Sequence, residues 1–455
     1  MNNHVIIVGL GDIGYHLALN LIALEIPLSI IERNNAALKD IYRFSEVQII
    51  NDSGESYNSL IKAGVKSAKI ILSTLANDSQ NILVSSLAKG VNPKILTISR
   101  IRNKNLLKTK SLHKVLNIDI PLYPEEEVAK HLFDLLKYNN TREFISMLDN
   151  KVVLRGLKVE KLSYLIGMTI SEIKKKFDKL NFLIAAISRE DEIETIIPNG
   201  QEKIEQYDVL HIFMLSKYEE KILKAMKYKR NKIRNSMVIG AGSYGTLITE
   251  EIVKRKISSK LIELDKTKAK LLDEKLLDTI ILYGDGSNKD VLRKNRVGKT
   301  DLFIAATSDG FSNIISCKLA KAEGAKNTVS VTYNKSIYNL SYMLGVDICL
   351  NPHYPVIDKV LSIYYPENIK SIKTIANEDA NIIEIDIKEN YPVVDQKLKD
   401  LSLGISVLVG LIKRDNILFL PSGKDYIMLN DTVFLFLSKK DINRVIDKFF
   451  KQKEK

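Results

Sequence analysis

Short runs of β-branched and other apolar residues alternate along the first third of the chain with longer stretches whose apolar residues recur at helical spacing. Runs at 4–8, 28–31, 47–50, 69–72 and 94–98 predict strands, and the stretches 15–24 and 80–89 predict two of the intervening helices. Strands that are apolar throughout and separated by helices are typical of a parallel sheet covered on both faces. We expect right-handed connections between successive strands.

The same pattern returns in the second half, where it begins with a second glycine-rich segment. Residues 5–14 (VIIVGLGDIG) recur as residues 237–245 (MVIGAGSYG). An offset of 231 positions relates the glycines and one glutamate, and an offset of 233 relates one aspartate and one threonine. Repetition at a nearly fixed spacing indicates a tandem duplication. The matched pairs are Gly9 and Gly240, Glu32 and Glu263, Asp52 and Asp285, and Thr74 and Thr307.

Each copy is followed by a smaller module with a motif of its own. Pro198 and Asp208 are ten residues apart, as are Pro421 and Asp431. Apolar runs at 184–188 and 192–197 flank a polar triplet, which predicts a hairpin. We predict four domains, and assign the basic stretch 227–232 to a linker between the halves. The predicted domains cover residues 1–138, 139–226, 235–366 and 367–455.

Composition narrows the class of protein. The 455 residues include 68 Lys and Arg against 55 Asp and Glu, a net charge of +13. Because the lysines are scattered among acids, we expect a solvated exterior; docking near an anionic membrane surface is the main alternative, and no nucleic-acid partner is expected. Two cysteines are too few for a disulfide framework. The six histidines do not have the spacing of metal ligands, so a metal site has little support. No apolar run reaches the ~18 residues of a membrane-spanning helix, and signal-peptide features are missing, so we expect a cytosolic protein.

The two glycine loops carry the candidate chemistry, since each follows a strand, opens a helix and precedes an acid at the end of the next strand. The first glycine would make a tight turn, the second would let a pyrophosphate approach the backbone, and the third would allow close helix–strand packing. Phosphates would meet free N–H groups at the helix N-terminus. Glu32 and Glu263 would accept hydrogen bonds from ribose hydroxyls, and a 2′-phosphate would be repelled, which disfavours NADP. The alternative is that the glycines only shape a turn.

Other residues of the two copies are weaker candidates. Asp52 and Asp285 could contact adenine or cap the next helix. Thr74 and Thr307 could face the crevice or serve as ordinary turn residues. Arg100 and Arg102 follow the fifth strand and suit phosphate or a surface ion pair. The second copy has no Arg there (331–334, VTYN), and it has Ser243 where the first has Asp12, so the two sites are expected to differ in ligand.

With these motifs, the chain resembles the TrkA family, the regulatory NAD-binding subunits of Trk potassium uptake systems. The resemblance covers essentially the whole length, with Asn51 departing from the glycine that is usual there. It implies the α/β class, with two Rossmann-like, doubly wound parallel-sheet domains (RCK N-terminal), each followed by a small α+β RCK C-terminal module. The cofactor-binding positions that it implies are Gly9, Leu10, Gly11, Asp12, Ile13, Gly14, Glu32, Asp52, Thr74, Leu75, Arg100, Gly240, Ala241, Gly242, Ser243, Tyr244, Gly245, Glu263, Asp285 and Thr307.

The function implied by this resemblance is binding rather than catalysis. NAD or NADH, with ATP or ADP as further candidates, would gate an integral-membrane potassium channel or transporter through a dimeric or tetrameric homo-oligomeric ring. The ring would lie on the inner face of the cell membrane, and the helical stretch 124–137 would transmit the motion. Alternatives are a regulator of a potassium efflux or antiport protein and an NAD-dependent oxidoreductase. The latter lacks a duplicated acid–base group, since His211 and His353 lie outside the motifs.

Overall fold

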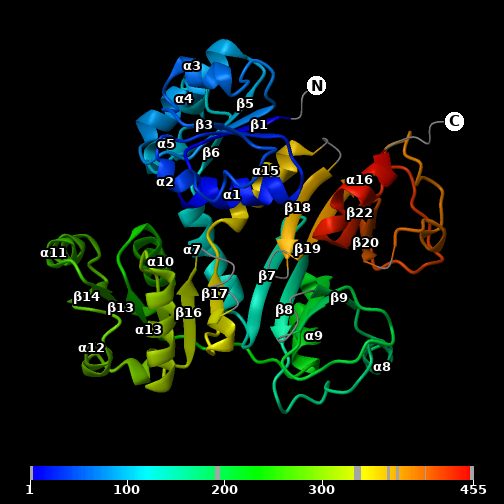
Figure 1. Cartoon of the computed structure of the whole chain (residues 1–455). Coiled ribbons are helices and arrows are strands. Elements are labelled where there is room, and N and C mark those ends of the chain that lie inside the picture. Colours follow the sequence, from blue (N-terminus) through cyan, green and yellow to red (C-terminus); the bar gives the residue numbers. More distant parts are fainter. Residues whose placement is uncertain are drawn as a thin grey trace. The chain divides into compact units, whose positions relative to one another are not determined.

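The computed structural model describes residues 4–189, 195–332, 340–365, 369–375, 379–404 and 406–450. The chain folds into two compact units, each described here by itself (Figure 1). The first unit comprises Met1–Pro124 and His353–Pro366, and the second comprises Glu125–Pro352 and Glu367–Lys455. Among the described residues, no helix combines the length and the hydropathy needed to cross a membrane.

The first unit is built on a six-stranded parallel sheet in the order β3-β2-β1-β4-β5-β6. The central strands β1 and β4 are buried along their whole length because helices cover both faces, which confirms the predicted strands and sheet. The sixth strand was not predicted, because it is three residues long and contains Pro121. The strands are β1 Val5–Val8, β2 Leu28–Ile31, β3 Gln48–Ile50, β4 Ile70–Ser73, β5 Leu96–Arg100 and β6 Ile120–Leu122.

A helix from far along the chain completes this unit. Helix α15 (Tyr354–Tyr364), coloured gold, packs against α1 (Figure 1). The Lys69 ammonium donates to the Tyr364 carbonyl and lies 5.4 Å from the centre of its ring, which fixes the end of α15 beside β4. The unit's other helices are α1 Asp12–Ala23, α2 Asn35–Leu38, α3 Tyr57–Lys62, α4 Asp78–Val91, α5 Lys104–Lys108 and α6 Lys110–Val115.

The second Rossmann-like sheet has the same strand order, β14-β13-β12-β15-β16-β17, which confirms the duplication at the level of fold. Its core gathers Met237, Ile262 and Phe303 from the strands and Ile314 and Cys317 from a covering helix. The strands are β12 Asn235–Ile239, β13 Ser258–Glu263, β14 Thr279–Tyr283, β15 Leu302–Ala305, β16 Asn327–Val331 and β17 Ile348–Leu350. Their helices are α10 Ser243–Lys254, α11 Lys266–Lys275, α12 Lys289–Lys294 and α13 Gly310–Ala322.

Helix α7 (Pro124–Leu135), which follows the first sheet in the sequence, belongs to the second unit. The Arg255 guanidinium at the end of α10 lies 3.9 Å from the centre of the Phe133 ring on α7. Helices α7 and α15 are therefore exchanged between the halves. The domain boundaries at 138/139 and 366/367 stay predictions, because the compact units follow packing rather than the repeat.

Two five-stranded antiparallel sheets of matching topology follow the Rossmann-like sheets, in the orders β10-β9-β11-β8-β7 and β21-β20-β22-β19-β18. The predicted hairpin is confirmed by the antiparallel pairing of β9 with β10, although residues 190–194 lie outside the described residues. The first module contains β7 Thr141–Met147, β8 Val152–Lys158, α8 Ile170–Lys176, β9 Phe182–Ser188, β10 Thr195–Ile196, β11 Val209–Leu215 and α9 Glu219–Ala225. The second contains β18 Ile369–Ile375, β19 Ala380–Asp386, β20 Val407–Arg414, β21 Ile417–Phe419, β22 Thr432–Ser438 and α16 Ile442–Phe450.

The aspartates of the small-module motif have a structural role that the duplication preserves. Asp208 Oδ2 accepts the Glu205 N–H at 2.7 Å, which closes the turn before β11. Asp431 Oδ2 accepts the Met428 N–H at 2.8 Å in the same position before β22. The Arg414 guanidinium also donates two hydrogen bonds to the Asp431 carboxylate, from Nε to Oδ1 and from an Nη to Oδ2, both at 2.8 Å, which makes a bidentate pair. The motif therefore fixes how the last strand enters each sheet.

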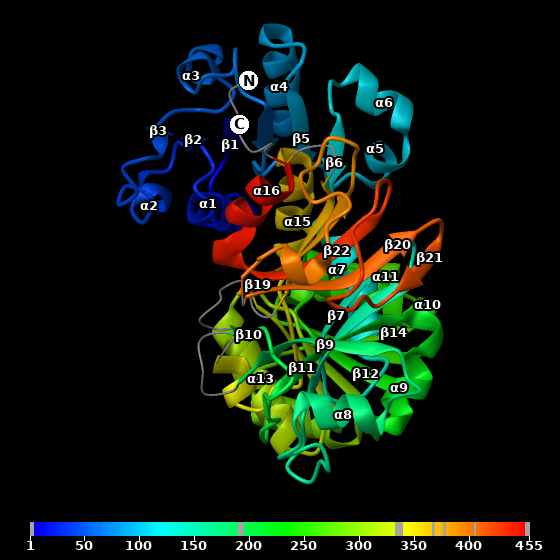
Figure 2. The same cartoon turned by 90° about the vertical axis from the view of Figure 1, so that its right-hand side faces the viewer.

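The two small sheets stack face to face through their apolar sides (Figure 2). The Phe213 ring of β11 meets the Phe436 ring of β22 edge-on, with centroids 4.8 Å apart, and Phe434 at 6.3 Å. Gly410 of β20 makes room for this contact, because a Cβ there would lie 2.3 Å from the Phe436 ring. The paired faces form one core from two modules that are far apart in sequence.

We predict that Phe213→Ala destabilises the chain by about 3–5 kcal/mol, because it leaves a cavity between the two small sheets. Urea unfolding of the full chain measures this loss. The control is Phe311→Ala, at a phenylalanine that is 54% exposed and should change the free energy of unfolding by less than about 0.5 kcal/mol. Equal losses in both variants would contradict the importance of the stacked faces.

Candidate nucleotide-binding site

The first and third glycines of each loop are required by the protein's own geometry. Gly9 and Gly240 have φ of +92° and +83°, a region that residues with side chains rarely adopt. A Cβ on Gly14 would lie 2.0 Å from the Gly9 carbonyl oxygen, and one on Gly245 would lie 1.9 Å from that of Gly240. These four glycines let the first helix of each Rossmann-like sheet start close to its strand.

The middle glycines are different, since nothing in the protein requires them. Gly11 and Gly242 have φ of −67° and −65°, which any residue adopts. A Cβ on either would lie 3.9 Å or more from every neighbouring atom. These two glycines are also the N-cap residues of α1 and α10, and they carry no side chain that could accept an N–H of the first helical turn. The arrangement offers a ligand direct access to the backbone and to the positive end of the helix dipole.

The ribose-binding candidates lie beside these loops. Glu32 Oε2 accepts the Leu10 N–H at 2.6 Å, and its Oε1 accepts the Asn34 N–H at 2.7 Å. Glu263 Oε2 likewise accepts the Ala241 N–H at 2.9 Å. The structure thus brings each acid to its own glycine loop.

The second acid has an additional cation beside it. Lys268 Nζ lies 3.4 Å from Glu263 Oε2. Burial raises the pKa of Glu263, but the backbone N–H donors and the Lys268 ammonium lower it by more. The net pKa therefore lies below its usual range. Glu263 is therefore held ionised, as a hydroxyl acceptor must be.

Thr74 contacts the first glycine loop. The prediction that Thr307 is its counterpart in the second copy is wrong, because Thr307 lies one residue too far along the chain. The Thr74 hydroxyl donates to the Gly9 carbonyl at 2.8 Å. Strand pairing sets Ser73 opposite Val8 and Ala305 opposite Ile239, so Ala306 corresponds to Thr74. Thr307 occupies the place of Leu75, and the two residues lie against Gly240 and Gly9 respectively. One extra residue in the second copy, between its second and third strands, causes the shift.

A buried asparagine in each copy was missed by the sequence analysis. Asn81 Oδ1 accepts the Leu75 N–H at 2.8 Å, and its Nδ2 donates to the Arg100 carbonyl at 2.9 Å. Asn313 makes the same bonds to the Thr307 N–H and the Val331 carbonyl, both at 2.9 Å. Each asparagine ties the loop after the fourth strand to the end of the fifth. Their shared offset of 232 positions was the signal that could have revealed them.

The predicted acids after the third strand make local contacts. Asp52 accepts the Ser59 hydroxyl at 2.5 Å and the Ser53 N–H at 2.7 Å, and these bonds hold the pKa of its carboxyl below the usual range. Asp285 accepts the Ser287 N–H at 2.8 Å. Neither aspartate caps the next helix, because Ser56 caps α3 and Asn288 caps α12, so the capping alternative is wrong. Contact with adenine stays a prediction for both.

The arginines after β5 differ in what they contact. The Arg102 guanidinium donates to the Ala76 carbonyl at 2.6 Å, and its backbone N–H donates to Asp78, so this side chain anchors a loop. Arg100, the last residue of β5, is half-buried and faces His353 closely enough to lower the pKa of that histidine. Of the Arg-free segment in the second copy, Tyr333 and Asn334 lie outside the described residues.

The remaining predicted positions form the walls and the helix starts. Asp12 and Ser243 are exposed first residues of α1 and α10, where a carboxylate is favoured by the helix dipole. The others are buried apolar or aromatic residues beside the loops: Leu10, Ile13, Ala241 and Tyr244.

The first copy has a histidine pair that the motifs did not indicate. The His16 ring on α1 stacks on the His353 ring just before α15, with centroids 4.5 Å apart. Burial, followed by the nearby His16 ring and the Arg100 cation, lowers the pKa of His353 to about 3, and burial lowers the pKa of His16 as well. The pair is therefore neutral at neutral pH and joins the second half of the chain to the helix of the first glycine loop.

Comparison with known proteins places these features in a family. The model of the TrkA-N domain matches residues 5–123 and 236–352, and that of the TrkA-C domain matches residues 382–449. The chain belongs to the TrkA family. The resemblance seen in the sequence is thereby confirmed.

Curated relatives of this family match along nearly the whole chain. The Trk system potassium uptake protein TrkA of Azorhizobium caulinodans is 23% identical over 447 residues, which cover 97% of each chain. A TrkA homolog of Archaeoglobus fulgidus is 27% identical over 452 residues, covering 98% of this chain and 99% of that one. Among solved structures, the GsuK channel bound to NAD has a TM-score of 0.62 at 12% identity, over 98% of this chain and 79% of that chain. This confirms the predicted fold.

We predict that acid destabilises the first unit through the histidine pair. Because the pKa of His353 is lower in the folded than in the unfolded chain, its contribution to stability is complete above pH 6.5 and is lost as pH falls toward 3. His353→Phe should reduce the pH slope of the free energy of unfolding by up to about 1.4 kcal/mol per pH unit between about pH 6 and 4. Unfolding curves at several pH values measure the slope. The control is His113→Phe, and an equal reduction in both variants would refute the role of the pair.

Proposed function

We propose that this chain is a nucleotide-binding regulatory subunit of a potassium uptake system. The names of its relatives, Trk system potassium uptake proteins, support the process. The two uncapped helix starts behind glycine loops support nucleotide binding. The chain would lie in the cytosol on the inner face of the membrane, as a homo-oligomer docked on an integral-membrane potassium channel or transporter.

The observation that carries nucleotide binding is the open space at Gly11 and Gly242. A glycine that neither backbone conformation nor packing requires is explained by a ligand that comes within contact of its backbone. The alternative, that the glycines only shape a turn, accounts for the first and third glycines but not for the second.

NAD or NADH is the ligand we propose for the first loop. Glu32 lies against the loop and would exchange its bond to the Leu10 N–H for ribose hydroxyls. Asp12 places a negative charge at the start of α1, which disfavours a triphosphate. The second loop has Ser243 there, so ATP or ADP is proposed as its alternative ligand. A structural neighbour, the GsuK channel, has been solved with NAD and with ADP.

Regulation would follow from differential binding. A nucleotide shifts the balance between two shapes of the assembly only by its difference in affinity for them. The His16–His353 contact and α15 connect the first loop to the second half of the chain, so a ligand that moves α1 would act on both halves. This coupling would then bias the membrane partner toward its open or closed state.

Catalysis is not part of the proposal. The buried His211 has a polar neighbour on each side, since its Nε2 is hydrogen-bonded to the Ser188 hydroxyl at 2.9 Å and its Nδ1 lies 2.7 Å from a Glu143 carboxylate oxygen. Gly156 of the intervening strand makes room for the pair, since a Cβ there would lie 2.9 Å from the Glu143 Cβ. This cluster lies on the first small sheet and not at a glycine loop.

A regulator of potassium efflux or antiport would use the same domains and is the second candidate function.

We predict that Gly11→Ala weakens NAD(H) binding at least tenfold while changing the free energy of unfolding by no more than about 1 kcal/mol. The added Cβ enters the space where a pyrophosphate would approach, but touches no protein atom closely. Titration calorimetry with NAD, NADH, NADPH, ATP and ADP measures affinity. Ligand at ~100 times its dissociation constant should add ~2.7 kcal/mol to the unfolding free energy of the wild-type chain.

The matched control is Gly14→Ala, where the added Cβ would meet the Gly9 carbonyl. This variant should lose ~1–3 kcal/mol of stability or more, as an overpacked site does. If no nucleotide binds the wild-type chain, or if Gly11→Ala binds as tightly, the nucleotide proposal fails. Rubidium uptake by cells that co-express the chain with a potassium transporter from the same genome separates uptake from efflux, since only an uptake regulator would increase influx.

A further inference from the structure

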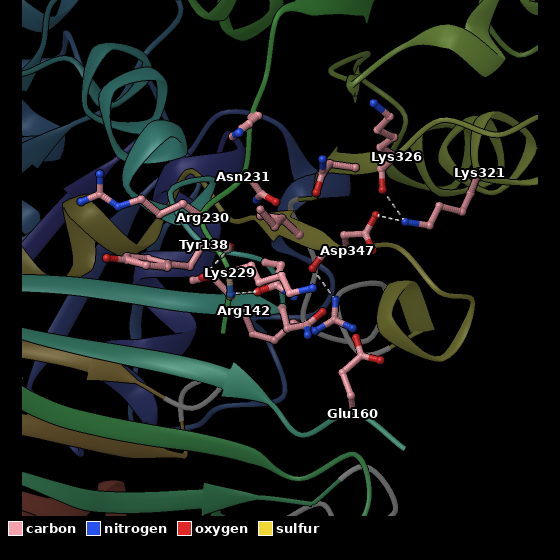
Figure 3. A pocket seen from close by; sticks show the side chains of 15 residues that line it. Tyr138, Arg142, Glu160, Lys229, Arg230, Asn231, Lys321, Lys326 and Asp347 are labelled. Carbon is pink, nitrogen blue, oxygen red and sulfur yellow. Dashed lines mark hydrogen bonds and ion pairs between the residues drawn. The ribbon is translucent and has the colours of Figure 1, made fainter. Parts of the chain in front are cut away.

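The second unit contains a pocket that has no part in the nucleotide proposal. Its volume is about 510 Å³, within the range of pockets that hold small molecules (Figure 3). Its walls come from the start of β7, from the segment that links the two halves, and from one edge of the second Rossmann-like sheet. Asn327 and Ile348 begin β16 and β17, so this is the edge opposite the glycine loop.

The link segment that forms one wall is firmly held rather than free. The Lys229 N–H donates to Asn139 Oδ1 at 2.7 Å, and Asn231 donates to the carbonyls of Lys137 and Leu136 at 3.1 and 2.9 Å. Tyr138 and Arg230 pair as an antiparallel bridge. The predicted linker is therefore a structured wall, and its side chains have defined places at the pocket.

The lining has a strong excess of positive charge. Two carboxylates, those of Glu160 and Asp347, face six cationic side chains, an excess of four charges. Such a concentration of one sign in a concave site attracts anions. The six cations are Arg142, Lys229, Arg230, Lys232, Lys321 and Lys326.

Most of these cations are not neutralised by a buried partner. The Arg142 guanidinium, which lies beside Asp347 in Figure 3, donates to two neutral acceptors, the carbonyls of Val346 and Asp347, and these bonds leave its charge uncompensated. Lys326 is the exception, because its Nζ lies 2.7 Å from the buried Asp301 carboxylate, although the lysine side chain itself is 69% exposed. Among the described residues, neither Lys229 nor Lys232 forms an ion pair.

Two cations are more fully engaged. Lys321 Nζ lies 2.6 Å from Asp347 Oδ2, which leaves that ammonium the least available of the set. Arg230 overlies the Tyr138 ring at 5.8 Å and pairs with the exposed Glu220 at 2.9 Å. The side chains left for a ligand are therefore Lys229 and Lys232, together with the edge of Arg142, whereas Lys326 shares its charge with Asp301.

The chemistry of this lining selects one class of ligand. The lysine and arginine side chains are donors only, and the asparagine amides add further N–H donors beside their acceptor oxygens, a combination that suits phosphoryl oxygens better than an apolar molecule. We propose that this pocket binds a small anion carrying two or more phosphoryl groups. Because its walls belong to the first small module, the link segment and the second Rossmann-like sheet, a bound anion would hold these three parts together. The proposal stands apart from nucleotide binding at the glycine loops.

The test uses the full chain carrying both Gly11→Ala and Gly242→Ala, so that the glycine loops do not contribute. Titration calorimetry with inorganic tripolyphosphate and with ATP should show binding of the first, or of both. Binding of both identifies the phosphates as the recognised group, and a clear preference for ATP identifies a nucleotide as the source. Binding of neither overturns the proposal.

Location is tested by Lys229→Gln with Lys232→Gln in the same background, which should weaken tripolyphosphate binding at least tenfold without changing the melting temperature of the free chain. The matched control is Lys174→Gln with Lys175→Gln, two exposed lysines of α8 that carry the same charge. Unchanged affinity in the pocket variant, or an equal loss in the control, overturns the proposal, because binding would then lie elsewhere or follow net charge alone.

Discussion

The stacked apolar faces of the two small sheets are the contact on which the rest of the second unit depends. The Phe213 and Phe436 rings lie on the faces that the two sheets turn toward each other, and these faces would be exposed if either module stood alone. An apolar sheet face has to be buried against another element. The duplication therefore supplies within one chain what an unduplicated protein would have to obtain from a second copy.

Duplication kept the frame of the nucleotide site and let its details diverge. Both copies retain strained first glycines, closely packed third glycines and a buried asparagine that ties two loops together. Other residues around the two loops differ, with Asp12 and Thr74 in one copy against Ser243 and Ala306 in the other. The copies therefore share the glycine and asparagine geometry that shapes the loops, and differ at positions that this geometry does not fix.

Local pattern predicted most of the parallel strands and the glycine turns, because strand period and glycine conformation are set by near neighbours. It failed where a partner lies far along the chain. The exchange of α7 and α15, the His16–His353 stack and the pairing of the small sheets all join segments that no periodicity relates. A single extra residue in the second copy also displaced the match of Thr74 by one position, since spacing alone cannot locate an insertion.

The position of α15 in the sequence has a consequence for folding during synthesis on the ribosome. The first sheet is complete once Leu122 has emerged, but the helix that covers α1 begins only at Tyr354. Until then α1 and its His16 lack the packing of α15, while the whole second Rossmann-like sheet is translated. Domains usually fold in order as they are synthesised. Here the packing of the first domain is completed only by a helix of the third, so the first domain cannot reach its final form before Tyr364 has been synthesised.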